Sequence, residues 1–292
     1  MRIDLHTHST VSDGTESPAE VVRAAKAAGL DVVALTDHDT TEGWDEAAAA
    51  ARELDISLVR GLEISTRYAG QGVHLLGYLP DPTWQPLVDA LQKILDGRSS
   101  RVPAVLERLR ALGIDIDLAD IHAVAGDAAA IGRPHIADAL IAKGVVASRD
   151  EAFRRFLGPR GPAYVDRYAA PLEEMIGLVA RAGGVSVVAH PWGRHLHSSL
   201  DSEAMRHLRD LGLSGIEVDH NDHSPETRER LRALARELDL VVTGSSDYHG
   251  LGKEDHPLGG NLTSVGDYEE LLARAASAAS ASGRVTPGVL VP

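Results

Sequence analysis

Hydrophobic and polar positions in residues 1–79 follow a repeating strand and helix rhythm. Short β-branched runs predict strands at Arg2–His8, Asp31–Thr36, Ile56–Ile64 and Val73–Leu79, and amphipathic Ala-rich runs predict helices at Ala19–Ala28 and Thr41–Leu54. Ser17 and Pro18 supply an N-cap and a first-turn proline to the first helix, and Gly29 ends it. Such alternation is typical of βα units and a parallel sheet.

The pattern becomes helical between Pro80 and Pro171, with no convincing strand. Candidate helices lie at Leu87–Leu95, Val102–Leu112, Ile136–Ala142 and Glu151–Phe156. We therefore expect residues 80–171 to form an inserted helical cap subdomain. The body of the protein is then one discontinuous domain made of residues 1–79 and 172–292.

The βα rhythm returns after residue 171. It predicts helices at Leu172–Ala182, Ser202–Leu211 and Pro225–Leu238, strands at Val185–His190, Gly215–Asp219 and Leu240–Ser245, and a last surface helix at Ala273–Ser282. Seven strands are expected in total. This number is compatible with either an open doubly wound sheet or a closed barrel.

Composition narrows the class of protein. The 292 residues contain no cysteine, which excludes disulfides, thiolate chemistry and cysteine-bound metals. No apolar run is long enough to span a membrane and the first residues do not resemble a signal peptide, so we expect a cytoplasmic protein. A net charge of −14 argues against a protein that coats nucleic acid. The segment from Arg98 to Arg167 differs, with 11 Lys and Arg against 9 Asp and Glu.

Histidines and carboxylates gather at the ends of the predicted strands. His6, His8, His38, Glu63, His190, Asp247 and His249 stand at or just after strand ends, Asp13 lies in the loop after the first strand, and His74 opens the fourth. Because the carboxyl ends of parallel strands meet at one edge, we expect these side chains to converge on metal ions. The isolated histidines, His122, His195, His197, His207 and His256, are interpreted as surface residues.

Nine donors are too many for a single ion. Two or three ions that share Glu63 as a bridge would use them all. Nitrogen and oxygen donors without sulfur suit manganese, zinc, iron or magnesium. Such a centre lowers the pKa of a bridging water and neutralises phosphate oxygens, which predicts hydrolysis of a phosphate ester.

These motifs resemble the PHP (polymerase and histidinol phosphatase) family. The resemblance rests on Asp4-Leu5-His6-Thr7-His8-Ser9, Ser12-Asp13-Gly14, Leu35-Thr36-Asp37-His38-Asp39, Gly61-Leu62-Glu63-Ile64-Ser65, His74-Leu75-Leu76-Gly77, Ala189-His190-Pro191 and Ser246-Asp247-Tyr248-His249. It implies a distorted (β/α)7 barrel with an inserted helical cap. It also implies a trinuclear metal centre, often manganese, held by the nine residues above.

Within that family the chain is most similar to the 3′,5′-nucleoside bisphosphate phosphatases, a branch that also includes a 5′-to-3′ exoribonuclease. The similarity rests on Asp13 and on two motifs within the one inserted segment, Gly97-Arg98-Ser99-Ser100-Arg101 and Gly132-Arg133-Pro134-His135-Ile136-Ala137. It implies that Arg98, Arg101, Arg133 and His135 bind the substrate. Arginine is suited to bidentate phosphate binding, which agrees with this role.

The leading hypothesis is a phosphoesterase that removes the 3′-phosphate of nucleoside 3′,5′-bisphosphates by attack of a metal-bridging hydroxide. A second is a 5′-to-3′ exoribonuclease on short or 5′-phosphorylated RNA, and a third is a catalytically silent metal-binding or polymerase-associated module. Histidinol-phosphate phosphatase activity is disfavoured by the insert and by Asp13. We expect a nucleotide or an RNA 5′ end as the substrate, and no membrane or obligate protein partner. Asp39 and His223 are candidates for the general acid.

Overall fold

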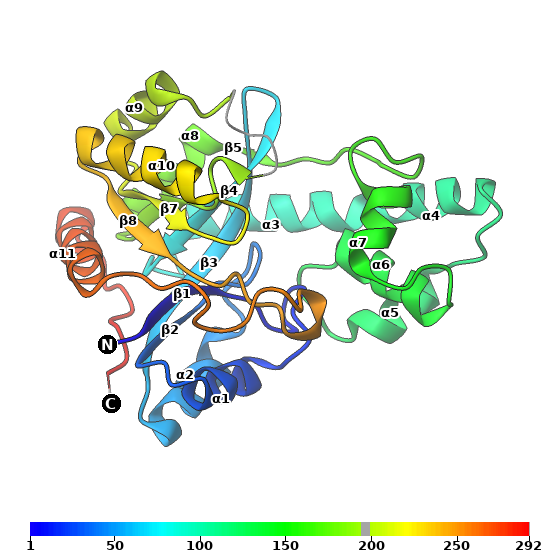
Figure 1. The fold of residues 1–292 in the computed structure, drawn as a ribbon, viewed down its shortest axis with the longest axis horizontal. Helices are drawn as coiled ribbons and strands as arrows, with labels where there is room; N and C mark the ends of the chain where they lie inside the picture. The colour runs from blue at the N-terminus through cyan, green and yellow to red at the C-terminus, as the bar shows by residue number, and fades with distance from the viewer. Residues whose placement is uncertain (194–198, 292) are drawn as a thin grey trace.

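The computed structural model of the protein describes residues 1–193 and 199–291. The described strands form one curled sheet in the order β1-β2-β3-β4-β6-β7-β8, with helices around it (Figure 1). The strands are β1 (Ile3–Thr7), β2 (Val32–Leu35), β3 (Ser57–Tyr68), β4 (Gln71–Tyr78), β5 (Ala170–Pro171, paired with β3), β6 (Val185–Val188), β7 (Gly215–Asp219) and β8 (Val241–Gly244).

The helices of the body are α1 (Pro18–Ala27), α2 (Trp44–Leu54), α8 (Leu172–Arg181), α9 (Ser202–Asp210), α10 (Pro225–Leu238), the 3₁₀ turn η3 (Gly250–Gly252) and α11 (Val265–Ser282). Between β4 and β5 lie α3 (Gln85–Ser100), α4 (Val102–Ala111), α5 (Leu118–Ala125), α6 (Arg133–Ala142), α7 (Arg149–Ala152) and the π-helical segment η1 (Phe153–Leu157). None of the described helices combines the length and apolar character needed to cross a bilayer.

The direction of β4 departs from the expected parallel sheet. β4 pairs antiparallel with both β3 and β6, because Ala69 and Gly70 join β3 to β4 in a two-residue turn with positive φ at both positions. A connection this short permits only a hairpin, whereas a parallel crossover needs a dozen or more residues. The start of β4 therefore lies beside the end of β3, and His74 is paired with Ser65.

The sheet closes almost completely. Thr7 at the end of β1 forms an isolated parallel bridge with Tyr248 beyond β8, and the His8 N–H donates to the Tyr248 carbonyl at 2.8 Å. This confirms the distorted barrel. Ile3, Leu5 and Tyr78 belong to one buried apolar group against which α11 places Tyr268 and Leu271. A second apolar group fills the space between the strands and the outer helices.

Several helices differ from the sequence prediction. α3 continues to Ser100, five residues past its expected end at Leu95, and the helix expected at Glu151–Phe156 is the short α7 followed by the π-helical η1. α11 begins at Val265, eight residues before the expected start. The Ser264 hydroxyl caps this start by accepting a hydrogen bond from the Asp267 N–H, and the buried Tyr268 anchors the first turn. The short helix α5 was not expected. Asp117 and Asp120 cap its start reciprocally, which is a local feature that could have revealed it.

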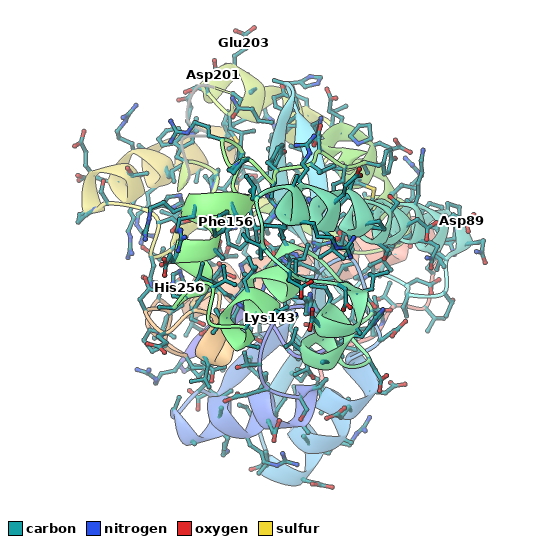
Figure 2. All side chains as sticks on the ribbon, turned by 90° about the vertical axis from the view of Figure 1, so that its right-hand side faces the viewer. Asp89, Lys143, Phe156, Asp201, Glu203 and His256 are labelled. Carbon is teal, nitrogen blue, oxygen red and sulfur yellow. The ribbon has the colours of Figure 1, made fainter. Side chains whose placement is uncertain are left out.

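The segment between β4 and β5 stands to one side of the barrel and is reached along α3 (Figure 1). Figure 2 looks onto this cap, with Lys143 and Phe156 on the face turned to the viewer. Its helices bury an apolar group of their own, which includes Val105, Leu109 and Leu140. The domain boundaries at residues 80 and 171 stay a prediction.

Candidate metal centre

The structure brings all nine predicted ligands together at one end of the barrel. Eight of them are buried, and the side chain of His74 is 27% exposed. His6 and Glu63 lie within β1 and β3, His74 lies in β4, and the other six follow strands in loops. His74 reaches the group although it stands near the start of its strand, because β4 runs antiparallel to β3.

Glu63 occupies the middle of this group. Its Oε2 atom lies 3.4 Å from His6 Nε2, 3.2 Å from His8 Nε2 and 3.0 Å from His38 Nδ1. Its Oε1 atom lies 2.7 Å from His74 Nδ1 and 3.5 Å from His190 Nε2. The two oxygens thus face different histidines, as a carboxylate that bridges two ions requires.

Asp13 and Asp247 complete the set on the other side of His8. Asp13 Oδ1 lies 3.2 Å from His249 Nε2, and its Oδ2 lies 3.5 Å from His38 Nε2. Asp247 Oδ1 lies 3.4 Å from His8 Nε2. The group therefore contains three sets of donors close enough to share an ion each: His8, Asp13, His38 and His249; His6, His8 and Asp247; and His38, Glu63 and His74.

The imidazole nitrogens face one another and the carboxylates in an arrangement that a cation would fit. His6 Nδ1 lies 3.1 Å from Glu217 Oε1, which assigns the ring proton to Nδ1 and leaves a lone pair on Nε2. That lone pair points to His8 Nε2 at 3.0 Å. His38 Nδ1 is close to Glu63 Oε2 without the geometry of a hydrogen bond. Donor atoms that converge in this way are typical of a metal site.

The charges in the group depend strongly on one another. Burial would raise the pKa of Glu63, but the surrounding His74, His38 and His6 hold this pKa well below its usual value. Burial likewise opposes protonation of His8, yet hydrogen bonds to Asp247 and Glu63 raise its pKa to about 9. Burial and the nearby Lys253 lower the pKa of His249 to about 4.

Three loop residues at this end of the barrel have a left-handed backbone. Asp39, His190 and Asp247 have φ values of 58°, 31° and 55°. Residues other than glycine adopt this backbone conformation at a cost in conformational free energy, and such residues concentrate at functional sites. The tight turns let each strand end present its side chain to the barrel mouth.

The sequence interpretation missed Glu217. This buried residue of β7 lies 3.1 Å from His6 Nδ1, and its Oε2 accepts a hydrogen bond from the His190 N–H at 2.9 Å. Contact with histidines lowers the pKa of Glu217 to about 2 despite its burial, so the carboxylate is charged. A charged residue in the middle of an apolar strand was the available indication.

Two further histidines belong to the surroundings of the centre. His220 directly follows β7, the same kind of position that identified the predicted ligands, and its Nε2 lies 3.3 Å from Asp247 Oδ2. His256 was interpreted as a surface residue, but this is wrong: it is 7% exposed, and its ring centroid lies 5.7 Å from that of His220 (labelled in Figure 2). His122 and His207 are exposed as expected. His195 and His197 lie outside the described residues.

An arginine group lies next to the metal centre. Arg98 of α3 donates from Nε to Asp39 Oδ2 at 2.6 Å and from Nη2 to Ser65 Oγ at 2.8 Å. Asp39, which the sequence offered as a candidate general acid, is therefore paired with this arginine. Arg101 is buried and its Nε has no hydrogen-bond partner. Burial, and then the positive charges of Arg133, Arg167 and Arg98, lower the pKa of Arg101 to about 8.

Arg167, from the segment that returns to the barrel, was not predicted as part of this group. Burial and the neighbouring Arg98 lower its pKa to about 10. Arg98 and Arg101 are buried, and Arg133 and Arg167 are half-buried, so four positive charges stand close together where solvent screens them poorly. This arrangement is electrostatically unfavourable unless an anion joins the arginines. Four arginines in such a group indicate an anion site.

The other two predicted substrate ligands lie in the first turn of α6. Arg133 donates from Nη1 to the Leu157 carbonyl at 2.9 Å, and its guanidinium lies over the rings of Phe153 and Tyr164. His135 is buried, and its Nδ1 accepts the Gly132 N–H at 3.1 Å. Since burial lowers the pKa of His135, the ring is neutral and carries its proton on Nε2.

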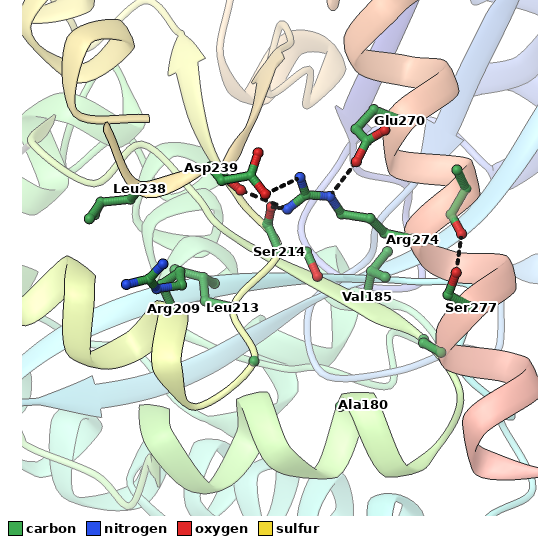
Figure 3. A pocket seen from close by; sticks show the side chains of 14 residues that line it. Ala180, Val185, Arg209, Leu213, Ser214, Leu238, Asp239, Glu270, Arg274 and Ser277 are labelled. Carbon is green, nitrogen blue, oxygen red and sulfur yellow. Dashed lines mark hydrogen bonds and ion pairs between the residues drawn. The ribbon is translucent and has the colours of Figure 1, made fainter. Parts of the chain in front are cut away.

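A hollow of about 440 Å³ lies at the opposite end of the barrel (Figure 3). Arg274 there is paired with two carboxylates, because it donates to Glu270 Oε1 at 2.7 Å and to Asp239 Oδ2 at 3.2 Å. Ser214, Val185 and Asp239 there lie at the amino ends of strands, where sites of α/β barrels are not formed. This hollow has the features of a surface cleft between helices, not of a reaction site.

Comparisons with known proteins agree with this geometry. The PHP domain family matches residues 4–154. A 3′,5′-nucleoside bisphosphate phosphatase of Chromobacterium violaceum is 34% identical over 264 residues, which cover 88% of this chain and 90% of the relative. A 5′-3′ exoribonuclease of Haemophilus influenzae is 34% identical over 248 residues, which cover 85% of this chain and 90% of the relative. A solved structure from Bifidobacterium adolescentis, provisionally assigned as a metal-dependent phosphoesterase, has a TM-score of 0.89 and 38% identity over 93% of this chain and 96% of that one.

Proposed function

Because this chain belongs to the PHP domain family, we propose that it is a metal-dependent phosphoesterase that removes the 3′-phosphate of nucleoside 3′,5′-bisphosphates. One observation carries the proposal: the arginine group, in which Arg98 and Arg101 are buried and Arg133 and Arg167 are half-buried, borders the cluster of nine donors. Arg98 contacts Asp39, the residue directly after the cluster member His38. A substrate with two phosphates needs this pairing, since one phosphate is hydrolysed and the other is held.

We assign the metal centre to His6, His8, Asp13, His38, Glu63, His74, His190, Asp247 and His249. Two or three divalent ions fit the three overlapping sets of donors, with Glu63 as the bridge. Manganese is our first choice, and zinc, iron and magnesium are alternatives, because all donors are nitrogen or oxygen. Ions of this kind lower the pKa of bound water and neutralise phosphate oxygens. We expect the cytoplasm as the location, in agreement with the absence of cysteine.

The arginine group is the proposed site for the second phosphate. Arg101 offers an unpartnered Nε, and Arg167 adds its charge from the returning segment. The neutral His135 donates from Nε2, because its Nδ1 already accepts the Gly132 N–H. Arg133 contributes its charge beside the Phe153 and Tyr164 rings. Arg98 adds charge while Asp39 keeps its guanidinium in place.

A second candidate function is 5′-to-3′ exoribonuclease activity on short or 5′-phosphorylated RNA. It is favoured by the Haemophilus influenzae relative, which is as similar to this chain as the phosphatase is. The same arginine group would hold the 5′-phosphate, and the same metal centre would act on the phosphodiester that follows. The two activities differ in the phosphate that reacts: it is a terminal monoester on the 3′-oxygen in the bisphosphate, and in RNA it is also esterified to the 5′-oxygen of the next nucleotide.

The direct test is phosphate release from adenosine 3′,5′-bisphosphate with added Mn²⁺, for the wild type and Asp247→Ala. We expect release by the wild type, with adenosine 5′-phosphate as the product, and none by the variant. Release of the 5′-phosphate, or no release, would overturn the leading proposal. Stepwise shortening of a 5′-phosphorylated oligoribonucleotide without release from the bisphosphate would establish the second candidate in its place.

A further inference from the structure

His220 is buried against the metal centre although it is not among the nine proposed ligands. It has no exposed surface, and its ring centroid lies 4.9 Å from that of His190. Its Nε2 atom lies 3.3 Å from Asp247 Oδ2. Two roles are chemically open to it: a ligand of a further ion, or a hydrogen-bond donor that orients Asp247.

The hydrogen bond on the other ring nitrogen decides between these roles. The backbone N–H of Asp222 donates to His220 Nδ1 at 3.0 Å. An N–H donor requires a lone pair on Nδ1, so the proton of the neutral ring is assigned to Nε2. His220 therefore donates to Asp247. To bind an ion through Nε2, the ring would have to carry its proton on Nδ1. Two hydrogen-bond donors, Nδ1–H and the Asp222 N–H, would then face each other at 3.0 Å.

The backbone around His220 is itself held by α10. Arg228 donates from Nη2 to the His220 carbonyl at 2.7 Å and from Nε to the His223 carbonyl at 3.1 Å. The His223 N–H closes the turn by donating to the His220 carbonyl at 3.1 Å. The tautomer and the direction of the His220 ring thus follow from a rigid turn, which is the arrangement expected of a residue that positions another.

The carboxylate of Asp247 is divided between two kinds of partner. Its Oδ2 receives His220 and the ammonium of Lys253. Its Oδ1 lies 3.5 Å from His6 Nε2 and 3.4 Å from His8 Nε2, among the metal donors. Since Oδ2 is occupied by two donors, only Oδ1 faces the ion.

We propose that His220 and Lys253 are positioning residues that hold Asp247 Oδ2, so that Asp247 binds metal through Oδ1 alone. The inference rests on the proposed metal centre but not on the identity of the substrate. It also explains why a lysine lies beside a cluster that already binds cations. The Lys253 ammonium pairs with Asp247 Oδ2, the oxygen that faces away from the proposed ions.

The alternative is a further metal site. The ligand atoms of His220, Asp247 and His256 lie close enough to hold an ion. In that case both histidines would be ligands, and Lys253 would have to leave Asp247 Oδ2. The two readings make opposite predictions for His220→Gln, because a glutamine amide donates a hydrogen bond but is a poor ligand for these metals.

The test measures Mn²⁺ bound per chain and its affinity, by elemental analysis after dialysis and by competition with a chelator. The variants are His220→Gln, His220→Ala, Lys253→Met and the control His256→Asn. We expect His220→Ala and Lys253→Met to lose about 10- to 100-fold in affinity for one ion, and His220→Gln and His256→Asn to stay within about threefold of the wild type. Equal losses for His220→Gln and His220→Ala would overturn the proposal, as would a loss for His256→Asn.

A second measurement keeps the result independent of folding defects in the alanine variant. In ¹⁵N-labelled wild-type protein, the His220 ring should show a protonated Nε2 before and after Mg²⁺ is added as a diamagnetic ion. Loss of the Nε2 proton on metal addition would show ligation and overturn the proposal. Failure of the proposed function, seen as a wild type that binds metal but releases no phosphate, would leave these results unaffected.

Discussion

Arg149 in the cap donates a hydrogen bond from Nη1 to the backbone carbonyl of Asp13 at 2.8 Å. The same guanidinium forms a two-point ion pair with Asp138, at 2.7 and 2.6 Å. The loop before Asp13 is held in a similar way, since the Ala129 N–H of the cap donates to the Val11 carbonyl at 3.0 Å. A cap residue thus positions the loop that carries a proposed metal ligand, which couples the cap to the centre.

Arg149→Met should therefore weaken metal binding without touching a ligand. Loss of the bond to the Asp13 carbonyl frees the loop, and we expect one ion per chain to bind about tenfold more weakly. Titration of the metal-free protein with Mn²⁺ would show this change. Arg155→Met is the matched control, because Arg155 contacts Glu151, the Val145 carbonyl and the Phe156 ring, which all lie within the cap. Unchanged affinity in Arg149→Met would show that the barrel alone orders the loop.

Manganese binding should release protons and become tighter as the pH rises. In the metal-free protein His8 has a pKa of about 9, so it carries a proton near neutral pH, and an ion must displace that proton to reach Nε2. The apparent affinity should therefore increase as the pH rises toward about 9. His6 adds to this effect, because burial opposes its protonation but Glu63 and Glu217 raise its pKa well above the usual value. Calorimetric titration in buffers of different ionisation enthalpy measures the protons released. A binding enthalpy independent of the buffer would contradict this prediction.

Arg101→Met should impair substrate binding while stabilising the fold. Removing one charge from the arginine group should raise KM for the bisphosphate by about tenfold with a smaller effect on kcat. The same change relieves repulsion from Arg98, Arg133 and Arg167, so the free energy of unfolding should rise by about 1 kcal/mol. Urea unfolding without ligand and initial rates give the two quantities. Arg110→Met, on the next helix, removes a hydrogen bond to the Ile116 carbonyl but none of the four arginines, so it should leave KM unchanged and should not stabilise the fold. A destabilised Arg101→Met would argue against an anion site.

Glu217→Gln should lower metal affinity although Glu217 is not a proposed ligand. The ionised carboxylate orients His6 through Nδ1 and increases the basicity of its Nε2. The amide keeps a hydrogen-bond acceptor but removes the charge, so we expect a loss of about tenfold in Mn²⁺ affinity. Chelator competition would measure it. Glu16→Gln is a suitable control, since Glu16 accepts a hydrogen bond from Tyr248 near the same loops. Wild-type affinity in Glu217→Gln would limit this residue to a packing role.

The gathering of eight of the nine side chains could be predicted from the sequence because each is local to a strand end, whereas His74 opens its strand and joins the group only because β4 is antiparallel. A strand end is marked by its own apolar run, and parallel strands bring their ends to one edge. His220 also directly follows a strand, so the strand-end criterion would have placed it at the barrel mouth had it been applied to β7. His256 was missed for a different reason: it lies in a loop with no adjoining strand, and only packing buries it against His220.

Sequence alone therefore determined most of the residues that stand at the barrel mouth, since hydrophobic periodicity and turn chemistry act over a few neighbouring positions. Tertiary structure decided what each residue does there. The reversed β4 brings His74 to Glu63, Asp39 binds Arg98 instead of acting from the open site, and the Asp222 N–H makes His220 a donor to Asp247. Each of these depends on the distance and direction between atoms from separate elements, which hydrogen bonding and charge fix only after the chain has packed.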